Sequence, residues 1–303
     1  MMADAPAVFR SGFVALIGRS NVGKSTLLNR LIGQKIAITS AKPQTTRNRI
    51  LGILTRPDGQ ILFLDTPGLH RARSPLNRQM VEQAREACRE VDLILWLVEA
   101  DRPVDDESLV ASALAQSKAP VVLVVNKDDL VKPERLLPLL GEYSRLREFA
   151  AIVPVSALTG AGVDRLVAVV MAQLPAGPRY YPEDQVTDLP ERFVVAELIR
   201  ERLLELSHDE LPYGAAVQIE SFREEAERDL VVIQAVIHVE RETHKGMVIG
   251  KGGAMIRRLG QEARQQIEAL LGCRVYLELF VRVNPDWSRS GRALRDFGYL
   301  PGD

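Results

Sequence analysis

The sequence GRSNVGKS at residues 18–25 decides the fold of the first half of this chain. It follows the apolar run 13–18 and precedes a stretch with helical spacing, which predicts a helix from about Lys24 to Leu31. Strand, glycine-rich loop and helix in this order are the context that the pattern GxxxxGK[ST] requires. The glycines let the backbone wrap a phosphate chain, Lys24 can reach the β- and γ-phosphates, and Ser25 can ligate Mg²⁺. The stretch therefore predicts a binding site for a nucleoside triphosphate.

Short apolar runs alternate with polar stretches of helical spacing through the first 175 residues. The runs predicted as buried strands are 13–18, 61–65, 93–98, 121–125 and 151–155. This alternation predicts a buried parallel sheet. The run ILGILT at 50–55, followed by the turn residues Pro57, Asp58 and Gly59, predicts a hairpin that adds one antiparallel edge strand. We therefore expect an α/β P-loop domain with a mostly parallel sheet.

Three further segments follow predicted strands and bear on the choice of nucleotide. In DTPG at 65–68, Asp65 can hold Mg²⁺ through water and Gly68 can offer its amide to a γ-phosphate. NKDD at 126–129 ends in Asp129, whose carboxylate can accept hydrogen bonds from guanine N1 and N2, a pair of donors that adenine lacks. SAL at 156–158 would place a backbone amide near guanine O6. Ligands of such sheets bind along the carboxyl ends of the strands, so the four segments together predict GTP rather than ATP.

These four segments resemble the motifs of translation-factor-related GTPases over about residues 11–175. The resemblance implies a Ras-like domain that binds GTP and Mg²⁺, hydrolyses GTP to GDP and reorders two switch segments. The nucleotide-binding residues that it implies are Gly18, Arg19, Ser20, Asn21, Val22, Gly23, Lys24, Ser25, Thr26, Asp65, Thr66, Pro67, Gly68, Asn126, Lys127, Asp129, Ser156, Ala157 and Leu158.

The same resemblance implies three metal ligands, which are Ser25, Asp65 and a threonine of the first switch segment. Both Thr45 and Thr46 stand in PQTTRNR at 43–49, and we favour Thr46. The residues expected to act in hydrolysis are Lys24, Asn21, Thr46 and Gly68.

Leu69 follows DTPG at the position where Ras-like enzymes use a glutamine to orient the attacking water. Because leucine cannot form a hydrogen bond with water, we expect slow intrinsic hydrolysis. In similar potassium-stimulated GTPases, an asparagine at the position of Asn21 helps to hold a K⁺ ion that supplies positive charge between the phosphates. The alternative is that Asn21 only caps the loop.

The second half predicts a different arrangement of elements. A helix is expected at 193–206, and strands at 217–222 and 231–240 form a hairpin. VIGKGG at 248–253 comes just before a stretch in which apolar residues recur at helical spacing. RVYLELFVRV at 274–283 alternates apolar and polar residues, as a half-buried strand does. The expected order is helix, strand, strand, short helix, glycine loop, helix, strand.

This order, with a GxxG loop between two helices, resembles an α+β KH domain of the prokaryotic type (type II), whose loop clamps the backbone of about four single-stranded nucleotides. The RNA-binding residues that the resemblance implies are Lys245, Ile249, Gly250, Lys251, Gly252, Gly253, Arg257 and Arg258.

Two rival interpretations of the whole chain remain. The first is a GTPase regulator whose second domain binds protein, with VIGKGG as a turn. The second is a P-loop kinase, against which Asp129 argues because a kinase would need adenine and an acceptor.

A GTPase domain followed by a KH domain, at this total length of 303 residues, resembles the Era family of bacterial GTPases over essentially the whole chain. The stretches at 210–220, 277–283 and 292–299 add to the resemblance. Ser20 departs from the family pattern, which could alter the rigidity of its loop, and residues 284–291 also depart from it, which leaves the role of Trp287 open. Similarity to this family implies binding to the 3′ region of small-subunit ribosomal RNA and assistance to 30S subunit assembly, with the nucleotide state tuning RNA affinity. The expected organisation is a tail at 1–10, a GTPase domain at 11–175, a linker at 176–191 and a KH domain with a C-terminal tail at 192–303.

Composition limits the remaining options. The net charge of −1 means that contacts with nucleic acid or membrane must come from local patches. The N-terminus lacks the pattern of a signal peptide, and two cysteines far apart in sequence fit a reducing cytosol. The longest charge-free stretch, at about 150–163, is interrupted by proline and glycine, so no span of a bilayer is predicted. We expect a cytoplasmic monomer. The helix at 193–206 is expected to be apolar on one side and charged on the other, and its contact with the inner membrane face is a minor alternative to packing on the sheet.

Overall fold

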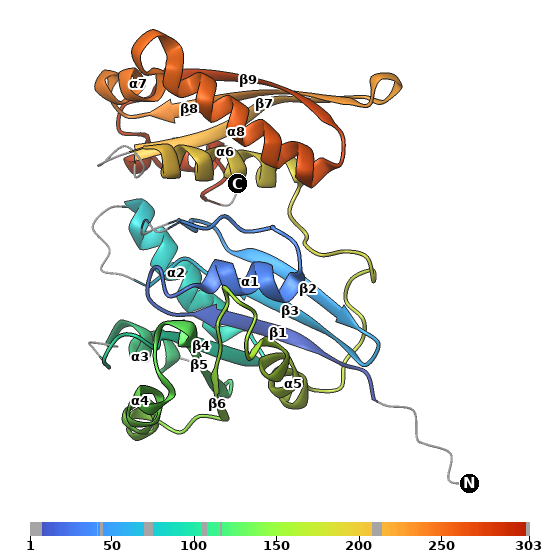
Figure 1. The fold of residues 1–303 in the computed structure, drawn as a ribbon, viewed down its shortest axis with the longest axis vertical. Coiled ribbons are helices and arrows are strands. Elements are labelled where there is room, and N and C mark those ends of the chain that lie inside the picture. Colours follow the sequence, from blue (N-terminus) through green and yellow to red (C-terminus); the bar gives the residue numbers. More distant parts are fainter. Residues whose placement is uncertain are drawn as a thin grey trace. The chain divides into compact units, whose positions relative to one another are not determined.

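The computed structural model describes residues 8–40, 42, 45–69, 75–104, 108–115, 117–207 and 214–300. Contacts between residues divide the chain into two compact units (Figure 1). The first unit contains residues 1–37, 46–72 and 80–188, and the second contains residues 38–45, 73–79 and 189–303.

The first unit is built on a six-stranded sheet in the order β2-β3-β1-β4-β5-β6. Its strands are β1 (Arg10–Ile17), β2 (Ile50–Arg56), β3 (Gly59–Asp65), β4 (Leu93–Glu99), β5 (Val121–Asn126) and β6 (Ala151–Pro154). Strand β2 pairs antiparallel with β3, and the other pairs are parallel. The predicted α/β fold with one antiparallel edge strand is confirmed.

Helices cover both faces of this sheet. They are α1 (Lys24–Ile32), α2 (Pro75–Arg89), α3 (Ser108–Leu114), α4 (Pro133–Leu146) and α5 (Val163–Gln173). Side chains of α2, α3 and α4 share one apolar cluster with β1, β4 and β5, and α1 and α5 lie in front of the sheet in Figure 1. Because the strands are buried on both faces, they appear in the sequence as continuous apolar runs.

The connector after α5 has no named helix or strand until α6 (Glu191–Leu206) begins, as the prolines predict. It packs against the antiparallel edge of the first unit. The buried Gln60 Oε1 accepts hydrogen bonds from the backbone amides of Tyr180 (2.9 Å) and Tyr181 (3.0 Å), and Ile53 N donates to Val186 O (2.8 Å). These contacts join the predicted linker, up to Asp188, to the first unit.

The second unit is a three-stranded sheet with three helices on one face. Strands β7 (Ala215–Glu225) and β8 (Leu230–Val239) are antiparallel, and β8 is parallel to β9 (Arg274–Val283). Helices α6, α7 (Glu242–Ile249) and α8 (Ala254–Leu271) share one apolar core with the strands. The predicted order of elements is confirmed, including the short helix before the glycine loop. No helix among the described residues has the length and apolar character needed to cross a membrane.

Helix α6 differs from the expected helix with one apolar and one charged side. Three of its charged residues, Glu197, Arg200 and Glu201, are buried. Arg200 Nη2 donates to Glu197 Oε2 at 2.6 Å, and Glu201 Oε1 accepts from the Thr39 amide at 2.8 Å, in the segment 38–45 that groups with this unit. Buried charges are tolerated because they are paired and hydrogen-bonded. The charged positions of α6 therefore contribute to the interior.

Trp287, whose role the sequence left open, anchors the C-terminal segment. Its side chain is fully buried, and its Nε1 donates to Gly214 O at 3.0 Å. Its ring lies 5.4 Å from that of Phe297 and 5.8 Å from that of Tyr299. Phe297 also contacts His238 of β8, at 4.4 Å between rings. The segment that contains α9 (Gly291–Asp296) is thereby attached to the sheet.

Candidate nucleotide and nucleic-acid sites

The glycine-lysine loop lies between β1 and α1, where the sequence places it. Lys24 is buried at the first position of α1, and its Nζ donates to Gly18 O (3.3 Å) and Arg19 O (2.9 Å). Burial lowers the pKa of the Lys24 ammonium to about 8, against the raising effect of Asp65. An anion bound beside this ammonium would favour its charged form. The loop can therefore hold a phosphate chain.

Three oxygen-bearing side chains meet next to Lys24. Ser25 Oγ lies 2.8 Å from Thr46 Oγ1 and donates to Asp65 Oδ2 at 2.6 Å. Asp65 Oδ1 is buried and has no hydrogen-bond partner. Burial raises the pKa of the Asp65 carboxyl to about 6, and the charge of Lys24 opposes this shift. A divalent cation at this position would satisfy the buried carboxylate.

The two candidate threonines point to different partners. Thr45 Oγ1 donates to Lys42 O at 2.7 Å, whereas Thr46 Oγ1 contacts Ser25. Only Thr46 is thus placed with the other two predicted metal ligands.

The segment after DTPG approaches the glycine-lysine loop closely. A Cβ on Gly68 would lie 2.7 Å from Ser20 Cα and 2.8 Å from Ser20 N, so only glycine fits there. Leu69 N donates to Gly18 O at 3.1 Å. The Leu69 side chain is buried in the apolar cluster that α2 shares with β1 and β4. Leu69 is therefore unable to orient water.

Asn126 at the end of β5 joins two of the predicted loops. Its Nδ2 donates to Val22 O (2.7 Å) and its Oδ1 accepts from Ala157 N (2.9 Å). The motif segments 18–25, 126–129 and 156–158 are thus brought together at the carboxyl end of the sheet. Asp129 is exposed three residues after Asn126, and Leu158 is exposed in the SAL segment.

The GxxG loop separates α7 from α8 and has a backbone that favours glycine. Gly250 has φ 72° and ψ 171°, and a Cβ there would lie 2.6 Å from Met255 Cβ. Gly252 and Gly253 also have positive φ angles, 59° and 77°. Lys251 is exposed, and Arg257 Nη2 donates to Gly252 O at 2.6 Å. Arg257 therefore stabilises the backbone of the loop, and its side chain is exposed to solvent.

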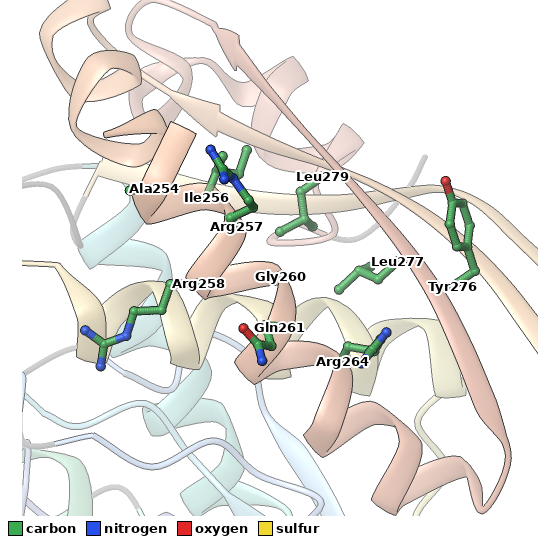
Figure 2. A pocket seen from close by; sticks show the side chains of 10 residues that line it. All are labelled: Ala254, Ile256, Arg257, Arg258, Gly260, Gln261, Arg264, Tyr276, Leu277 and Leu279. Atoms are coloured by element: carbon green, nitrogen blue, oxygen red, sulfur yellow. The ribbon is translucent and has the colours of Figure 1, made fainter. Parts of the chain in front are cut away.

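A groove of about 780 Å³ runs between α8 and β9, and Figure 2 shows the side chains that line it. Arg257 and Arg258, both predicted from sequence, lie along it. Lys245, Ile249 and residues 250–253 do not line it; they belong to α7 and the adjoining loop. Basic side chains beside apolar lining suit a polyanion with planar bases.

Sequence reasoning missed several residues of both sites. In the groove these are Gln261, Arg264 and Tyr276. The spacing of 257, 261 and 264 on one helical face could have identified the first two. At the nucleotide site Arg30 was missed, although its Nε donates to Ala157 O at 3.2 Å. No pattern in the sequence indicates that contact, since it joins residues more than a hundred positions apart.

Comparisons with known proteins agree with this geometry. A family model described as a 50S ribosome-binding GTPase matches residues 13–127, and one described as a KH domain matches residues 210–288. The chain is 58% identical to GTPase Era of Geotalea uraniireducens, over 96% of this chain and 98% of the relative. It is 54% identical to GTPase Era of Geobacter metallireducens, over 98% and 100%.

Two solved structures are similar over nearly the whole chain. One is a single-substitution variant of Era of Aquifex aeolicus bound to GDP·AlF₄⁻, with a TM-score of 0.93, 40% identity, and coverage of 97% of this chain and 100% of that one. The other is Era in complex with MgGDPNP and nucleotides 1506–1542 of 16S ribosomal RNA, with a TM-score of 0.93, 41% identity and the same coverage.

Proposed function

The chain belongs to the Era family of GTPases, and on that premise we propose that it binds GTP with Mg²⁺ and hydrolyses GTP to GDP and phosphate. We propose further that it binds single-stranded RNA from the 3′ region of small-subunit ribosomal RNA and thereby assists 30S subunit assembly. One observation carries the proposal. The four motif segments follow β1, β3, β5 and β6, whose carboxyl ends lie along one edge of the sheet, in a chain that also has a GxxG loop beside a basic groove.

We assign the phosphates to the loop 18–26, where Lys24 and the backbone amides would bind them. The guanine base is assigned to Asp129 and the SAL segment. Asn126 ties these regions together through Val22 and Ala157, so its role is to fix the distance between the phosphate and base subsites.

The residues fit Mg²⁺, which takes oxygen ligands and keeps several of its waters in nucleotide sites. Ser25, Thr46 and Asp65 would hold it, since their oxygens already meet and Asp65 Oδ1 is buried without a partner. When bound, this ion would neutralise charge on the β- and γ-phosphates. Thr45 does not fit, because its hydroxyl is directed to Lys42 O.

Hydrolysis is expected to be slow without K⁺, because the buried Leu69 cannot position water. Asn21 is exposed on the phosphate loop with φ 67°, and we propose that its side chain helps to hold K⁺ between the phosphates. GTP turnover in KCl should exceed that in matched NaCl by at least about tenfold. In Asn21→Gly, which tolerates the same φ and removes the side chain, the two rates should converge. Equal rates of the unchanged protein in both salts would remove K⁺ from the proposal.

RNA is assigned to the GxxG loop and the groove between α8 and β9. Gly250, Gly252 and Gly253 would let the loop backbone approach phosphates, and Lys251, Arg257 and Arg258 would supply charge. Lys245 and Ile249 belong to α7, the helix that leads into the loop. The choice of the small-subunit RNA follows from the relative that holds nucleotides of 16S ribosomal RNA.

The experiment that tests the whole function is RNA affinity in two nucleotide states. The affinity and footprint of the full chain on nucleotides 1506–1542 of 16S ribosomal RNA should differ between the complex with a non-hydrolysable GTP analogue and the complex with GDP. The difference is expected because the nucleotide alters the segment next to Thr46. Equal affinities in both states would show that the nucleotide does not switch RNA binding.

For the chain as a whole, we propose a GTPase domain at 11–175 and a KH domain at 192–303. The protein is proposed to act as a cytoplasmic monomer, since one chain supplies every residue assigned above. Membrane contact through α6 is disfavoured because Val195, Leu198 and Ile199 of this helix are buried in the core of the second unit.

A further inference from the structure

Glu99 is a buried acidic residue at the end of an otherwise apolar strand. It is the last residue of β4, and its side chain is only 6% exposed. Its backbone is opposite Asn126 in the parallel pairing of β4 with β5, and Ala100 N donates to Asn126 O at 2.8 Å. A buried carboxylate is costly unless it is paired, so its partners indicate what it does.

Glu99 has two cationic partners, whose side chains differ in their exposure to solvent. Its Oε1 accepts from Lys127 Nζ in a hydrogen-bonded ion pair, and its Oε2 lies 3.0 Å from Arg102 Nε. The side chain of Arg102 is 62% exposed, whereas that of Lys127 is 31% exposed. Exposed pairs contribute little, so the pair with Lys127 is the one that matters.

Lys127 has an unusual backbone conformation at the base subsite. Its φ and ψ of 63° and 35° are left-handed, which is uncommon for a residue other than glycine. This conformation turns the chain from β5 into the short helix Asp128–Leu130, closed by a hydrogen bond from Leu130 N to Lys127 O (3.0 Å). Asp129 lies within that turn.

We propose that Glu99 is a positioning residue for guanine recognition: by fixing the ammonium of Lys127 it holds the turn that presents the Asp129 carboxylate to the base. The inference rests on the proposed function, because it takes Asp129 as the group that binds guanine. Without Glu99 the Lys127 ammonium is free to pair with the neighbouring carboxylates of Asp128 and Asp129. Either a loosened turn or a neutralised Asp129 would weaken base recognition.

The test compares GDP with IDP, whose base lacks the exocyclic N2 amino group. Dissociation constants of both nucleotides are measured by titration for the unchanged chain, Glu99→Gln and the control Arg102→Gln, which removes the exposed partner of the same carboxylate. We expect Glu99→Gln to weaken GDP binding by about tenfold and IDP binding by less, because GDP has contacts from both N1 and N2 to lose whereas IDP has only the contact from N1. Arg102→Gln should stay within about twofold of the unchanged chain for both nucleotides.

A double-mutant cycle with Lys127→Met shows whether Glu99 acts through Lys127. In the Lys127→Met background, Glu99→Gln should leave the ratio of IDP to GDP affinity unchanged. Thermal unfolding without nucleotide is recorded for each variant. If Glu99→Gln unfolds, Glu99→Asp gives the same test, since it shortens the reach to Lys127 and should also lower the preference for GDP.

The inference is overturned if Glu99→Gln weakens GDP and IDP equally, or changes them as little as Arg102→Gln does. A different result contradicts the proposed function itself, namely equal affinity of the unchanged chain for GDP and ADP. In that case the inference fails with it.

Discussion

Asp129→Asn should lower the affinity for GDP by about a hundredfold or more and raise the affinity for XDP. In the proposed site the carboxylate would accept two hydrogen bonds from guanine N1 and N2, and each bond to a charged group contributes about 1.5–3 kcal/mol. An amide at this position places a donor against the guanine amino group. Xanthine carries an oxygen in place of that amino group, so the same amide donor becomes favourable. Titration with GDP, XDP and ADP measures the exchange.

The matched control for this change is Asp128→Asn. Asp128 precedes Asp129 in the same turn, and its backbone amide donates to Val155 O at 3.2 Å. The pKa of its carboxyl is raised by partial burial and by the charge of Asp129, but we assign it no contact with the base. Its replacement should leave the preference for GDP in place. A loss of GDP binding in Asp129→Asn without any gain for XDP would contradict the assignment of the base to Asp129.

Lys251→Asp combined with Gly252→Asp should reduce RNA affinity by about a hundredfold while leaving GDP affinity within about twofold. Two carboxylates would replace one ammonium where we propose that the loop binds phosphates, and phosphate contacts supply much of the affinity for nucleic acid. Both positions are exposed, and a Cβ on Gly252 meets no atom within 4 Å. The φ of Gly252, 59°, disfavours most side chains, and aspartate is among the residues that adopt it more readily. Gly250 is a poorer target, because its Cβ would clash with Met255 and a loss of binding would then be ambiguous.

The measurement is fluorescence anisotropy of nucleotides 1506–1542 of 16S ribosomal RNA at one fixed salt concentration. The control is Arg228→Asp, which makes a similar change of charge at the β7–β8 turn, at the other end of β8 from α7 (Figure 1). It should bind RNA nearly as well as the unchanged chain. If the loop variant retains its RNA affinity, VIGKGG is only a turn, and the interpretation of the second domain as a protein-binding module gains support.

Much of the fold could be predicted because each unit has clear hydrophobic patterning. The alternation in RVYLELFVRV predicted β9 with the bounds that the structure has, since one face of that strand packs in the core and the other does not. The continuous apolar runs predicted the parallel sheet for the complementary reason, as both of its faces are covered. Strand ends were predicted less accurately, since β6 ends at Pro154 and the prediction ended it at Val155.

Polar residues inside the structure were the main omissions. Gln60 lies just before the predicted strand 61–65, and the structure includes it in β3, where it forms three hydrogen bonds with residues 180 and 181. These bonds depend on where the connector lies. Glu197, Arg200 and Glu201 were expected on the charged side of α6 and are buried instead. Periodicity separates apolar from polar positions, and it gives no information on which polar residues find a partner inside.

The sequence by itself determined the order of the elements and indicated the four segments of the candidate nucleotide site, because loop chemistry and strand patterning are local properties. Only the tertiary structure decided between Thr45 and Thr46, placed Tyr276 in the groove, and paired Glu99 with Lys127. These decisions depend on distances between residues far apart in the chain. Such distances follow from the packing of strands and helices, and short-range spacing does not encode them.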